Sequence, residues 1–372
     1  MSATRSIAHA LMNTTEPVVV ATVVRITGSS YGGVGTRMVI PQNAPPIGIV
    51  SGGCLESDLA EHAKEVQLSH VPKVVTYDTR ADDDAAWGLG LGCNGLIDVL
   101  LEPLTETEAR ELAGILMRGL DSQEPAVLAT GIEGNRLVGA HALMLGAETY
   151  TIGWDDSELL QEVRDDSDEA FAEARRGLVR QYGGVTVAFE IILPSVDLLI
   201  CGSGPDVVPL VSLGRQLDWN LTVVDHRPAG PAHAERFPGA RLVECHDPRE
   251  LARATRITRF TAAVVMSHNY ARDLDYVRAL LGSDAGYIGV LGPRARTERM
   301  FADMTSAGET ILHGERIHSP VGLDLGGDGP ERIALSIVSE VAAVISNRSA
   351  GHLRESRSPL HPAPPREAAE KT

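Results

Sequence analysis

Two glycine-rich loops carry cysteines within the first hundred residues of this 372-residue chain. Residues 51–56 (SGGCLE) follow a short apolar run and contain Cys54, and residues 87–95 (WGLGLGCNG) contain Cys93. Glycine lets the backbone approach a ligand closely and supplies positive φ where a turn needs it. Each loop alone is more typical of a small apolar cysteine packed beside a turn. Two such loops together predict sulfur chemistry, metal handling or a sulfur-bearing cofactor.

Charge and length limit the class of protein. The formal net charge is -17, from 33 lysines and arginines against 50 aspartates and glutamates. Nucleic acid and anionic membranes both require a positive surface, so neither is expected as a partner. No stretch approaches the ~20 apolar residues that span a bilayer, and no leader segment is evident, which predicts a cytoplasmic protein. The length predicts two or three domains.

The cysteines do not follow a zinc or disulfide pattern. The chain holds Cys54, Cys93, Cys201 and Cys245, with no Cys-x-x-Cys motif among them. A structural zinc site is therefore not expected, and without a secretory signal disulfides are not expected either. Reduced thiols of this kind can act as ligands or as sulfur carriers.

The first half of the chain reads as an α+β domain, residues 1–193, with a degenerate internal repeat. Residues 126–193 repeat the strand pattern of the first copy, so the copies are expected at about 1–115 and 120–193. The second copy lacks both cysteine motifs, which assigns the chemistry to the first copy. Strands are expected at residues 17–27, 37–40, 47–50, 74–77 and 96–101 of the first copy, with a helix at 55–65.

The second half is expected to form a Rossmann-like domain, residues 194–347, followed by a disordered tail, 348–372. Short buried strands alternate with helical stretches, which predicts a doubly wound parallel sheet with helices on both faces. The predicted fold class is α/β. Strands are expected at 196–201, 221–225, 262–266 and 287–291, and helices up to about 217, at 273–281 and at 330–345.

A dinucleotide-type loop opens this second domain. Gly202 and Gly204 follow a strand and precede a helix, and Asp225 ends the next strand, as in the Rossmann fingerprint. Pro205 removes one N–H donor, and Asp206 places a negative charge where a phosphate would lie. Asp225 could hold a ribose hydroxyl or simply end its strand.

Two further loops at strand ends carry polar groups. His268 follows one strand, and Arg294 follows the next within a Gly-Pro-Arg-Ala-Arg sequence. Open α/β sheets bind ligands at the carboxyl ends of their strands, so these side chains are expected to line a crevice. Arg294 could contact a phosphate or a carboxylate.

The assembled motifs resemble the XdhC/CoxI family of molybdoenzyme maturation factors, over about residues 17–346. The first domain supplies residues 21–40, 47–63 and 87–104 to this resemblance. The second supplies LLICGSGPDVVPL, LTVVDHRP, AAVVMSHNYARDLDYVRALL, YIGVLGPRARTERM and the stretch from IHSPVGLDLGGDG to VSEVAAV. The chain departs from the family at Tyr31, Pro205 and Val207.

The resemblance implies a chaperone for molybdenum cofactor, either molybdopterin or its cytosine dinucleotide form, more than an enzyme. Such a protein holds and protects the cofactor while a cysteine desulfurase replaces a molybdenum oxygen with sulfur. It then delivers the cofactor to an apoenzyme of the xanthine, aldehyde or carbon monoxide dehydrogenase type. Family members tend to self-associate, so a homodimer is expected.

On this hypothesis the two cysteines lie near each other and face the molybdenum, since soft thiolates suit such metals. The cofactor would lie between the first domain and the Rossmann crevice. Cofactor-binding positions are expected at Arg37, Gly52, Gly53, Gly92, Gly95, Gly202, Gly204, Asp225, His268 and Arg294, with Cys54 and Cys93 nearest the metal.

Two other functions remain open from the sequence. One is an NAD(P)-dependent oxidoreductase that uses the dinucleotide-type loop, with His268 as acid or base. The other is a scaffold that joins the desulfurase to the apoenzyme and binds no small ligand.

Overall fold

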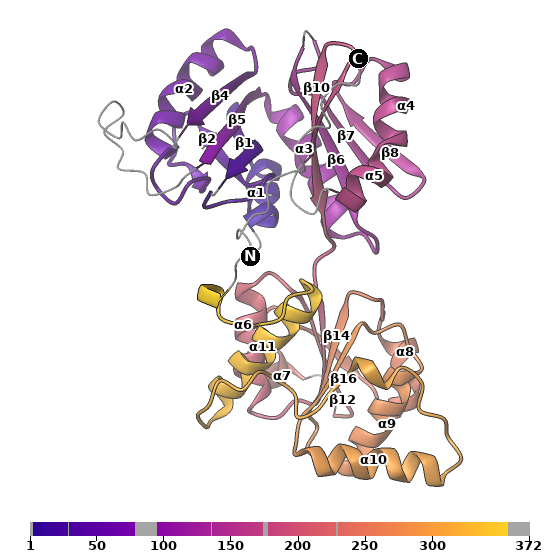
Figure 1. Cartoon of the computed structure of the whole chain (residues 1–372). Coiled ribbons are helices and arrows are strands. Elements are labelled where there is room, and N and C mark those ends of the chain that lie inside the picture. The colour runs from indigo at the N-terminus through magenta and orange to yellow at the C-terminus, as the bar shows by residue number, and fades with distance from the viewer. Residues whose placement is uncertain are drawn as a thin grey trace. The chain divides into compact units, whose positions relative to one another are not determined.

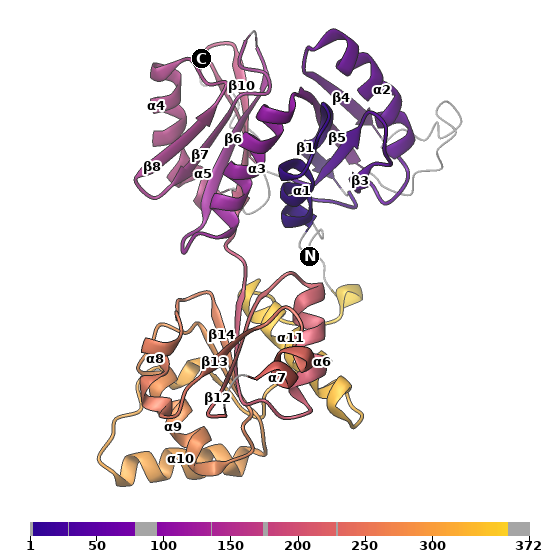
Figure 2. The ribbon, with the colours of Figure 1, turned by 180° about the vertical axis from the view of Figure 1, so that it is seen from behind.

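The chain forms two compact units, Ser2–Pro194 and Ser195–Glu355. The computed structural model describes residues 3–28, 30–78, 95–134, 136–173, 178–227 and 230–355. Within these residues, every hydrophobic cluster belongs wholly to one unit or the other. Each unit therefore has its own core (Figures 1 and 2).

The first unit contains two five-stranded antiparallel sheets of identical order, β3-β2-β1-β5-β4 and β8-β7-β6-β10-β9. The fold therefore contains the internal repeat that the sequence predicts. The first copy contains α1 (Ala3–Met12), β1 (Val18–Gly28), β2 (Arg37–Pro41), β3 (Ile47–Gly48), α2 (Glu56–Ser69), β4 (Lys73–Asp78) and β5 (Gly95–Leu104). The second contains α3 (Glu106–Leu120), β6 (Ala126–Glu133), β7 (His141–Leu145), β8 (Glu148–Ile152), α4 (Ser157–Asp165), α5 (Ser167–Glu173), β9 (Leu178–Tyr182) and β10 (Val185–Ile192).

The strand registers of the two copies match residue by residue. Thr22 pairs with Arg37 in the first sheet, and Thr130 pairs with His141 in the second. Each copy also has a bulge at the same place, after Val23 in β1 and opposite the start of β10 in β6. Arg37 and His141 are therefore equivalent positions.

The expected boundary between the copies needs correction. A first copy of about 1–115 would include most of helix α3, but α3 precedes β6 as α1 precedes β1. The second copy therefore begins at α3. The two helices pack against each other within one core that also takes side chains from both sheets, including Val20 of β1 and Leu128 of β6.

Buried polar pairs join the copies reciprocally. Arg37 of the first copy donates a hydrogen bond of 3.0 Å to Glu190 of the second. His141 of the second copy lies 2.7 Å from Glu102 of the first. Glu102 and Glu190 occupy equivalent positions, two residues beyond the partners of Thr22 and Thr130. Each copy thus supplies a glutamate to the other, and the two glutamates occupy equivalent positions of the repeat.

The second unit is a parallel six-stranded sheet of order β13-β12-β11-β14-β15-β16, with helices on both faces. Successive side chains of β11 alternate between the faces: Leu198 and Ile200 pack with α6 and α11, and Leu199 and Cys201 pack with α9 and α10. Its elements are β11 (Asp197–Cys201), α6 (Val207–Gln216), β12 (Asn220–Asp225), α7 (Pro231–Arg236), β13 (Arg241–Glu244), α8 (Leu251–Ala254), β14 (Thr261–Val265), α9 (Tyr270–Leu281), β15 (Tyr287–Val290), α10 (Arg294–Ser306), β16 (Ile317–His318) and α11 (Pro330–Ile345). This is the expected Rossmann-like fold.

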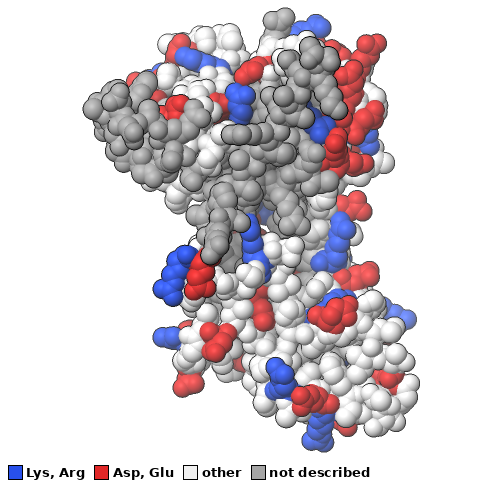
Figure 3. Space-filling view, viewed as in Figure 1, with Lys and Arg blue, Asp and Glu red and all other residues white. Residues whose placement is uncertain are grey.

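Several elements were not expected from the sequence, namely α1, α3, α5, β9, α7, β13, α8, α10 and β16. The tail beyond residue 355 lies outside the described residues. In the part of the chain that the structure describes, no helix has the length and apolar character needed to cross a membrane. Figure 3 shows acidic side chains gathered over α4 and α5 of the second copy.

Candidate functional site

The two copies of the first unit differ most in the loops at one end of the sheet. In the second copy, β9 and β10 are joined by Gly183 and Gly184 alone, whereas residues 79–94 join β4 to β5. The loop from β3 to α2 covers residues 49–55, against residues 153–156 between β8 and α4. Both longer loops carry the cysteine motifs. The shorter loops of the second copy show that the sheet can form without the extra length of these two loops.

The Cys54 loop is held by Glu56 at the start of α2. The carboxylate of Glu56 accepts hydrogen bonds from the N–H groups of Val50 at 3.0 Å and Ser51 at 2.8 Å. The Ser51 hydroxyl donates to the same carboxylate at 2.7 Å and accepts from the N–H of Leu55 at 2.7 Å. Although burial works in the opposite direction, these hydrogen bonds lower the pKa of Glu56. The Glu56 carboxylate therefore holds residues 50–55 in this conformation.

The tip of this loop presents backbone and a thiol to solvent. Gly52 and Gly53 have φ of 79° and 108°, and neither N–H bonds another described residue. A Cβ at Gly52 would lie 3.1 Å from the ring of Tyr31, whereas a Cβ at Gly53 would meet nothing within 4 Å. The Cys54 thiol is exposed and free. A ligand can therefore approach backbone N–H groups and a thiol together.

Of the second cysteine loop, residues 87–95, the structure describes only Gly95. Cys93 and Gly92 lie outside the described residues. Gly95 is the first residue of β5 and pairs with Gly28 at the end of β1. The expectation that Cys54 and Cys93 lie near each other stays a prediction.

Arg37 does not offer its guanidinium to a phosphate. It is 2% exposed, and its donors bond Glu190 and, at 2.8 Å, the carbonyl oxygen of Gly35. Gly35 has φ of 87°, and a Cβ there would lie 2.3 Å from the Glu190 carboxyl group. Burial acts against the charge of Arg37, but Glu190 and, to a smaller extent, Glu102 raise its pKa. Arg37 is therefore a structural residue of the repeat.

In the second unit, the usual phosphate position of a Rossmann loop is filled by the protein's own carboxylate. A Cβ at Gly204 would lie 2.4 Å from Oδ1 of Asp206, so that oxygen sits directly over the glycine. Oδ2 of Asp206 lies 2.7 Å from Nε2 of His268. Pro205 supplies no N–H, and the N–H of Val207 bonds the carbonyl of Gly204. A pyrophosphate cannot take this place while Asp206 holds it.

Asp225 is also saturated by neighbouring side chains. Arg227 donates to both carboxylate oxygens, at 3.1 Å and 2.8 Å, and the Ser203 hydroxyl donates to Oδ2. His226 lies 2.9 Å from Oδ1. Burial acts against ionisation, but the hydrogen bonds from Arg227 and Ser203 outweigh it and hold the pKa of Asp225 well below its usual range. Gly202, beside it, has φ of 134°, and a Cβ there would lie 2.6 Å from the Met266 carbonyl oxygen.

The arginines that follow β15 lie differently from each other. Arg294 begins α10 and is exposed, without a hydrogen-bond or ion-pair partner among the described residues. Arg296 forms an ion pair of 2.8 Å with buried Asp273. Arg294 is therefore open to a ligand and its assignment stays a prediction, while Arg296 braces α9 against α10.

The remaining two cysteines are structural. Cys201 and Cys245 are free and buried in the core of the second unit. Burial raises the pKa of both thiols, with Asp273 adding to the effect at Cys201 and Asp247 at Cys245. A thiol whose pKa is raised is a poor nucleophile at neutral pH. No group of three or more metal-ligating side chains occurs among the described residues.

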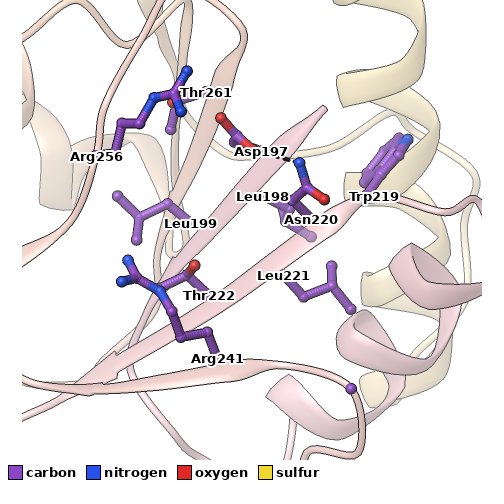
Figure 4. A pocket seen from close by; sticks show the side chains of 11 residues that line it. Asp197, Leu198, Leu199, Trp219, Asn220, Leu221, Thr222, Arg241, Arg256 and Thr261 are labelled. Atoms are coloured by element: carbon purple, nitrogen blue, oxygen red, sulfur yellow. Dashed lines mark hydrogen bonds between the residues drawn. The ribbon is translucent and has the colours of Figure 1, made fainter. Parts of the chain in front are cut away.

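Two cavities lie at opposite ends of the parallel sheet. The larger, of about 370 Å³, is at the amino ends of the strands, and Figure 4 shows Arg241 and Arg256 on one side of it and Trp219 on the other. The second, of about 260 Å³, is at the carboxyl ends, beside Gly202 and Asp225. Ligands of open α/β sheets bind at the carboxyl ends. The second cavity is therefore the candidate site in this unit.

Two sequence profiles of one protein family match the chain. The profile of the XdhC and CoxI family matches residues 11–78, and that of the XdhC Rossmann domain matches residues 198–341. The chain belongs to the XdhC/CoxI family. The two matched ranges contain the Cys54 loop and the carboxyl ends of the parallel strands in the second unit.

Relatives of this XdhC/CoxI protein match it over most of its length. It is 29% identical over 332 residues to a probable xanthine dehydrogenase subunit of Bacillus subtilis (strain 168), covering 89% of this chain and 94% of that one. It is 25% identical over 328 residues to the molybdenum cofactor insertion chaperone PaoD of Escherichia coli (strain K12), covering 88% and 83%. The crystal structure of a xanthine dehydrogenase from Bacillus halodurans matches with a TM-score of 0.75 and 27% identity, covering 95% of this chain and 98% of that one.

Sequence reasoning missed Glu56, Ser203 and Arg227. Glu56 stands two residues after Cys54, where an acidic residue at a helix start signals an N-terminal interaction. Arg227 stands two residues after Asp225, and that short spacing could have indicated that the carboxylate is neutralised. Ser203 sits between the two glycines of the fingerprint and gave no signal of its own.

Proposed function

We propose that this protein binds molybdenum cofactor as cargo, protects it, supports its sulfuration and delivers it to a xanthine-dehydrogenase-type molybdoenzyme. The finer assignments, a molybdopterin or cytosine dinucleotide form of the cargo, a cysteine desulfurase as donor and a homodimer, belong to the same proposal. Support comes from the family match over both units and from the name of the PaoD relative.

One observation of the structure carries the proposal. The first copy of the repeat bears an exposed thiol beside two glycine N–H groups without partners among the described residues. The corresponding loop of the second copy, residues 153–156, is shorter and has no cysteine. The molybdenum of this cofactor already bears the sulfur atoms of a dithiolene, so a thiolate is a compatible neighbour for it. The open space at Gly53 admits a bulky anionic group to within contact of the backbone.

Each part of the loop has a separate task. The Cys54 thiol provides the soft group nearest the metal end of the cargo. The N–H groups of Gly52 and Gly53 provide donors for an oxygen or sulfur ligand of the metal. Tyr31, which is 64% exposed and lies against Gly52, covers one side of the tip. Glu56 fixes the loop so that these groups point outward together.

The test is cofactor retention. The full chain, purified without oxygen from cells fed molybdate, should carry molybdenum and pterin in near-equal amounts. Cys54→Ser should lower both at least tenfold and lower the activation of a xanthine-dehydrogenase-type apoenzyme to the same degree. The matched control is Asp155→Ser, which changes the corresponding loop of the second copy, where Asp155 is exposed and pairs with Arg136.

Equal molybdenum and pterin contents in Cys54→Ser and the parent protein would contradict the role of the thiol. Purification with a nicotinamide nucleotide and without pterin would favour the oxidoreductase instead. A protein that activates the apoenzyme but never carries pterin would favour the scaffold.

A further inference from the structure

The cavity at the carboxyl edge of the Rossmann sheet is lined on one side by arginines. It measures about 260 Å³, and Arg227 after β12 and Arg272 in the first turn of α9 both line it. Asn269 lines the same cavity and caps α9 by accepting a hydrogen bond of 3.1 Å from the N–H of Arg272. This side of the edge is cationic, whereas the glycine-loop side is occupied by Asp206.

Arg272 has a donor that the protein does not use. Its Nη1 is buried and has no hydrogen-bond partner among the described residues, while Nη2 reaches the carbonyl of His246 at 3.5 Å. A buried donor of a charged group without a partner is costly and rare in folded proteins. An acceptor brought by a ligand into the cavity would remove that cost.

Asp225, by contrast, has no capacity left for a ribose. Its oxygens accept from Arg227 and Ser203, and His226 lies beside Oδ1. In Rossmann domains that bind NAD, the corresponding carboxylate receives the ribose hydroxyls. Here the carboxylate instead fixes the guanidinium of Arg227, which remains half exposed at the cavity.

We propose that this cavity binds a phosphate ester, with Arg227 and Arg272 as its ligands and Asp225 as a positioning residue for Arg227. Planar guanidinium groups recognise phosphate through paired N–H donors. The phosphate lies on the β12–α9 side of the edge and not over the glycine loop, where the pyrophosphate of a dinucleotide lies. The inference does not depend on the proposed function, because a nucleotide and a phosphorylated pterin both carry the group.

The full chain is titrated calorimetrically at low salt with pyrophosphate, cytidine 5′-monophosphate, neopterin phosphate and unphosphorylated cytidine. The phosphorylated probes should bind, cytidine should not, and affinity should fall as salt rises. Tighter binding of cytidine 5′-monophosphate than of neopterin phosphate identifies a nucleotide as the source of the phosphate; the reverse identifies the pterin.

Arg272→Gln and Arg227→Gln should each weaken pyrophosphate binding at least tenfold. Arg253→Gln is the matched control, since Arg253 lies in α8 of the same unit, its side chain is 86% exposed, and the charge change is identical. Thermal unfolding of every variant establishes that it is folded. Equal affinity in Arg272→Gln, Arg227→Gln and Arg253→Gln, or no binding of any phosphorylated probe, would overturn the proposal.

Asp225→Asn separates the positioning role from a ribose-binding role. The amide cannot accept from both Nε and Nη2 of Arg227 as the carboxylate does, so the guanidinium loses its fixed position, and pyrophosphate and cytidine 5′-monophosphate should both bind several-fold more weakly. A ribose ligand would show a different pattern, with pyrophosphate unaffected and cytidine 5′-monophosphate weakened. That pattern would overturn the assignment of Asp225.

Discussion

At the scale of single residues, the loop around Cys54 depends on a carboxylate that the chain supplies itself. Glu56 gathers N–H groups of Val50, Ser51 and Leu55 as an external anion would at a helix N-terminus. The loop can therefore keep its shape without cargo. The N–H groups left over, at Gly52 and Gly53, are those that a ligand can reach.

Glu56→Gln should destabilise the protein in a pH-dependent way. The folded-state pKa of Glu56 is lowered, so its stabilisation is full above the unfolded-state value of about 4.3 and is lost as pH falls through the folded-state value. The variant should lose about 1 kcal/mol of unfolding free energy at pH 7 and match the parent in strong acid. Urea unfolding across this pH range measures the difference.

The control for Glu56 is Glu61→Gln on the same helix, whose side chain is 72% exposed in its pair with Lys64. Its effect should stay below about 0.5 kcal/mol at every pH. Coincident curves for Glu56→Gln and the parent at pH 7 would contradict the bracing role.

Glu190→Gln tests the structural role of Arg37. Removal of the charge leaves a buried guanidinium without compensation, which costs about 3–5 kcal/mol. Urea unfolding at neutral pH gives the loss, and Lys64→Gln in the exposed pair should cost less than about 1 kcal/mol. An unchanged unfolding curve for Glu190→Gln would make Arg37 a ligand candidate again.

The candidate site could be predicted from the sequence only where its residues adjoin in the chain. Gly52, Gly53 and Cys54 adjoin in the sequence, and their turn is evident from it. The partner of Arg37 lies 153 residues away, so nothing near Arg37 indicates that it is neutralised. The same holds for Arg272, whose cavity forms only when three strands align.

At the scale of elements, α3 holds the first unit together. It begins with a capping box, in which Thr105 and Glu108 exchange hydrogen bonds, and it packs against α1 and both sheets. The predicted bounds put most residues of α3 in the first copy, because neither α1 nor α3 was predicted and the equivalence of the two helices was therefore not visible.

Leu112→Ala should therefore affect the whole unit. Leu112 is 1% exposed in the core shared by the two copies, and such truncations cost about 2–5 kcal/mol. Leu68→Ala, on α2 at 85% exposure, should change the unfolding free energy by less than about 0.5 kcal/mol. Equal effects of the two variants in urea unfolding would show that α3 is not central.

The repeat also indicates how to remove a loop without harming the sheet. In the second copy, Tyr182 and Val185 flank a two-glycine turn, and Tyr77 and Ile97 occupy the matching register in the first. Replacement of residues 78–96 by Gly-Gly should leave a folded protein within about 1 kcal/mol of the parent, with molybdenum retention lost. Retained molybdenum would exclude this connection from the site.

At the scale of the whole molecule, the two units have separate cores. The alternation of strands and helices predicts the Rossmann unit well, because parallel strands buried on both faces give long apolar runs. The antiparallel repeat is harder to delimit, since its short strands resemble one another. Strand β13 and helix α10 were missed because half-exposed elements leave weak patterns.

Fragments 1–194 and 195–372 should each fold alone. Circular dichroism should show a cooperative thermal transition for each, and the full chain should show both transitions. The second fragment should keep the phosphate affinity of the full chain. A fragment that melts without cooperativity would show that its core is incomplete.

Each copy of the repeat holds a buried polar side chain whose partner lies in the other copy, through Arg37 with Glu190 and His141 with Glu102. Neither half can be exchanged for an unrelated sequence without leaving a buried polar group of the other half unpaired, so the halves must be inherited together. The Cys54 loop, residues 49–55, makes its described side-chain hydrogen bonds within the first copy. The loops of the first copy can therefore change in evolution to bind new cargo, while the residue pairs between the copies keep the two sheets together.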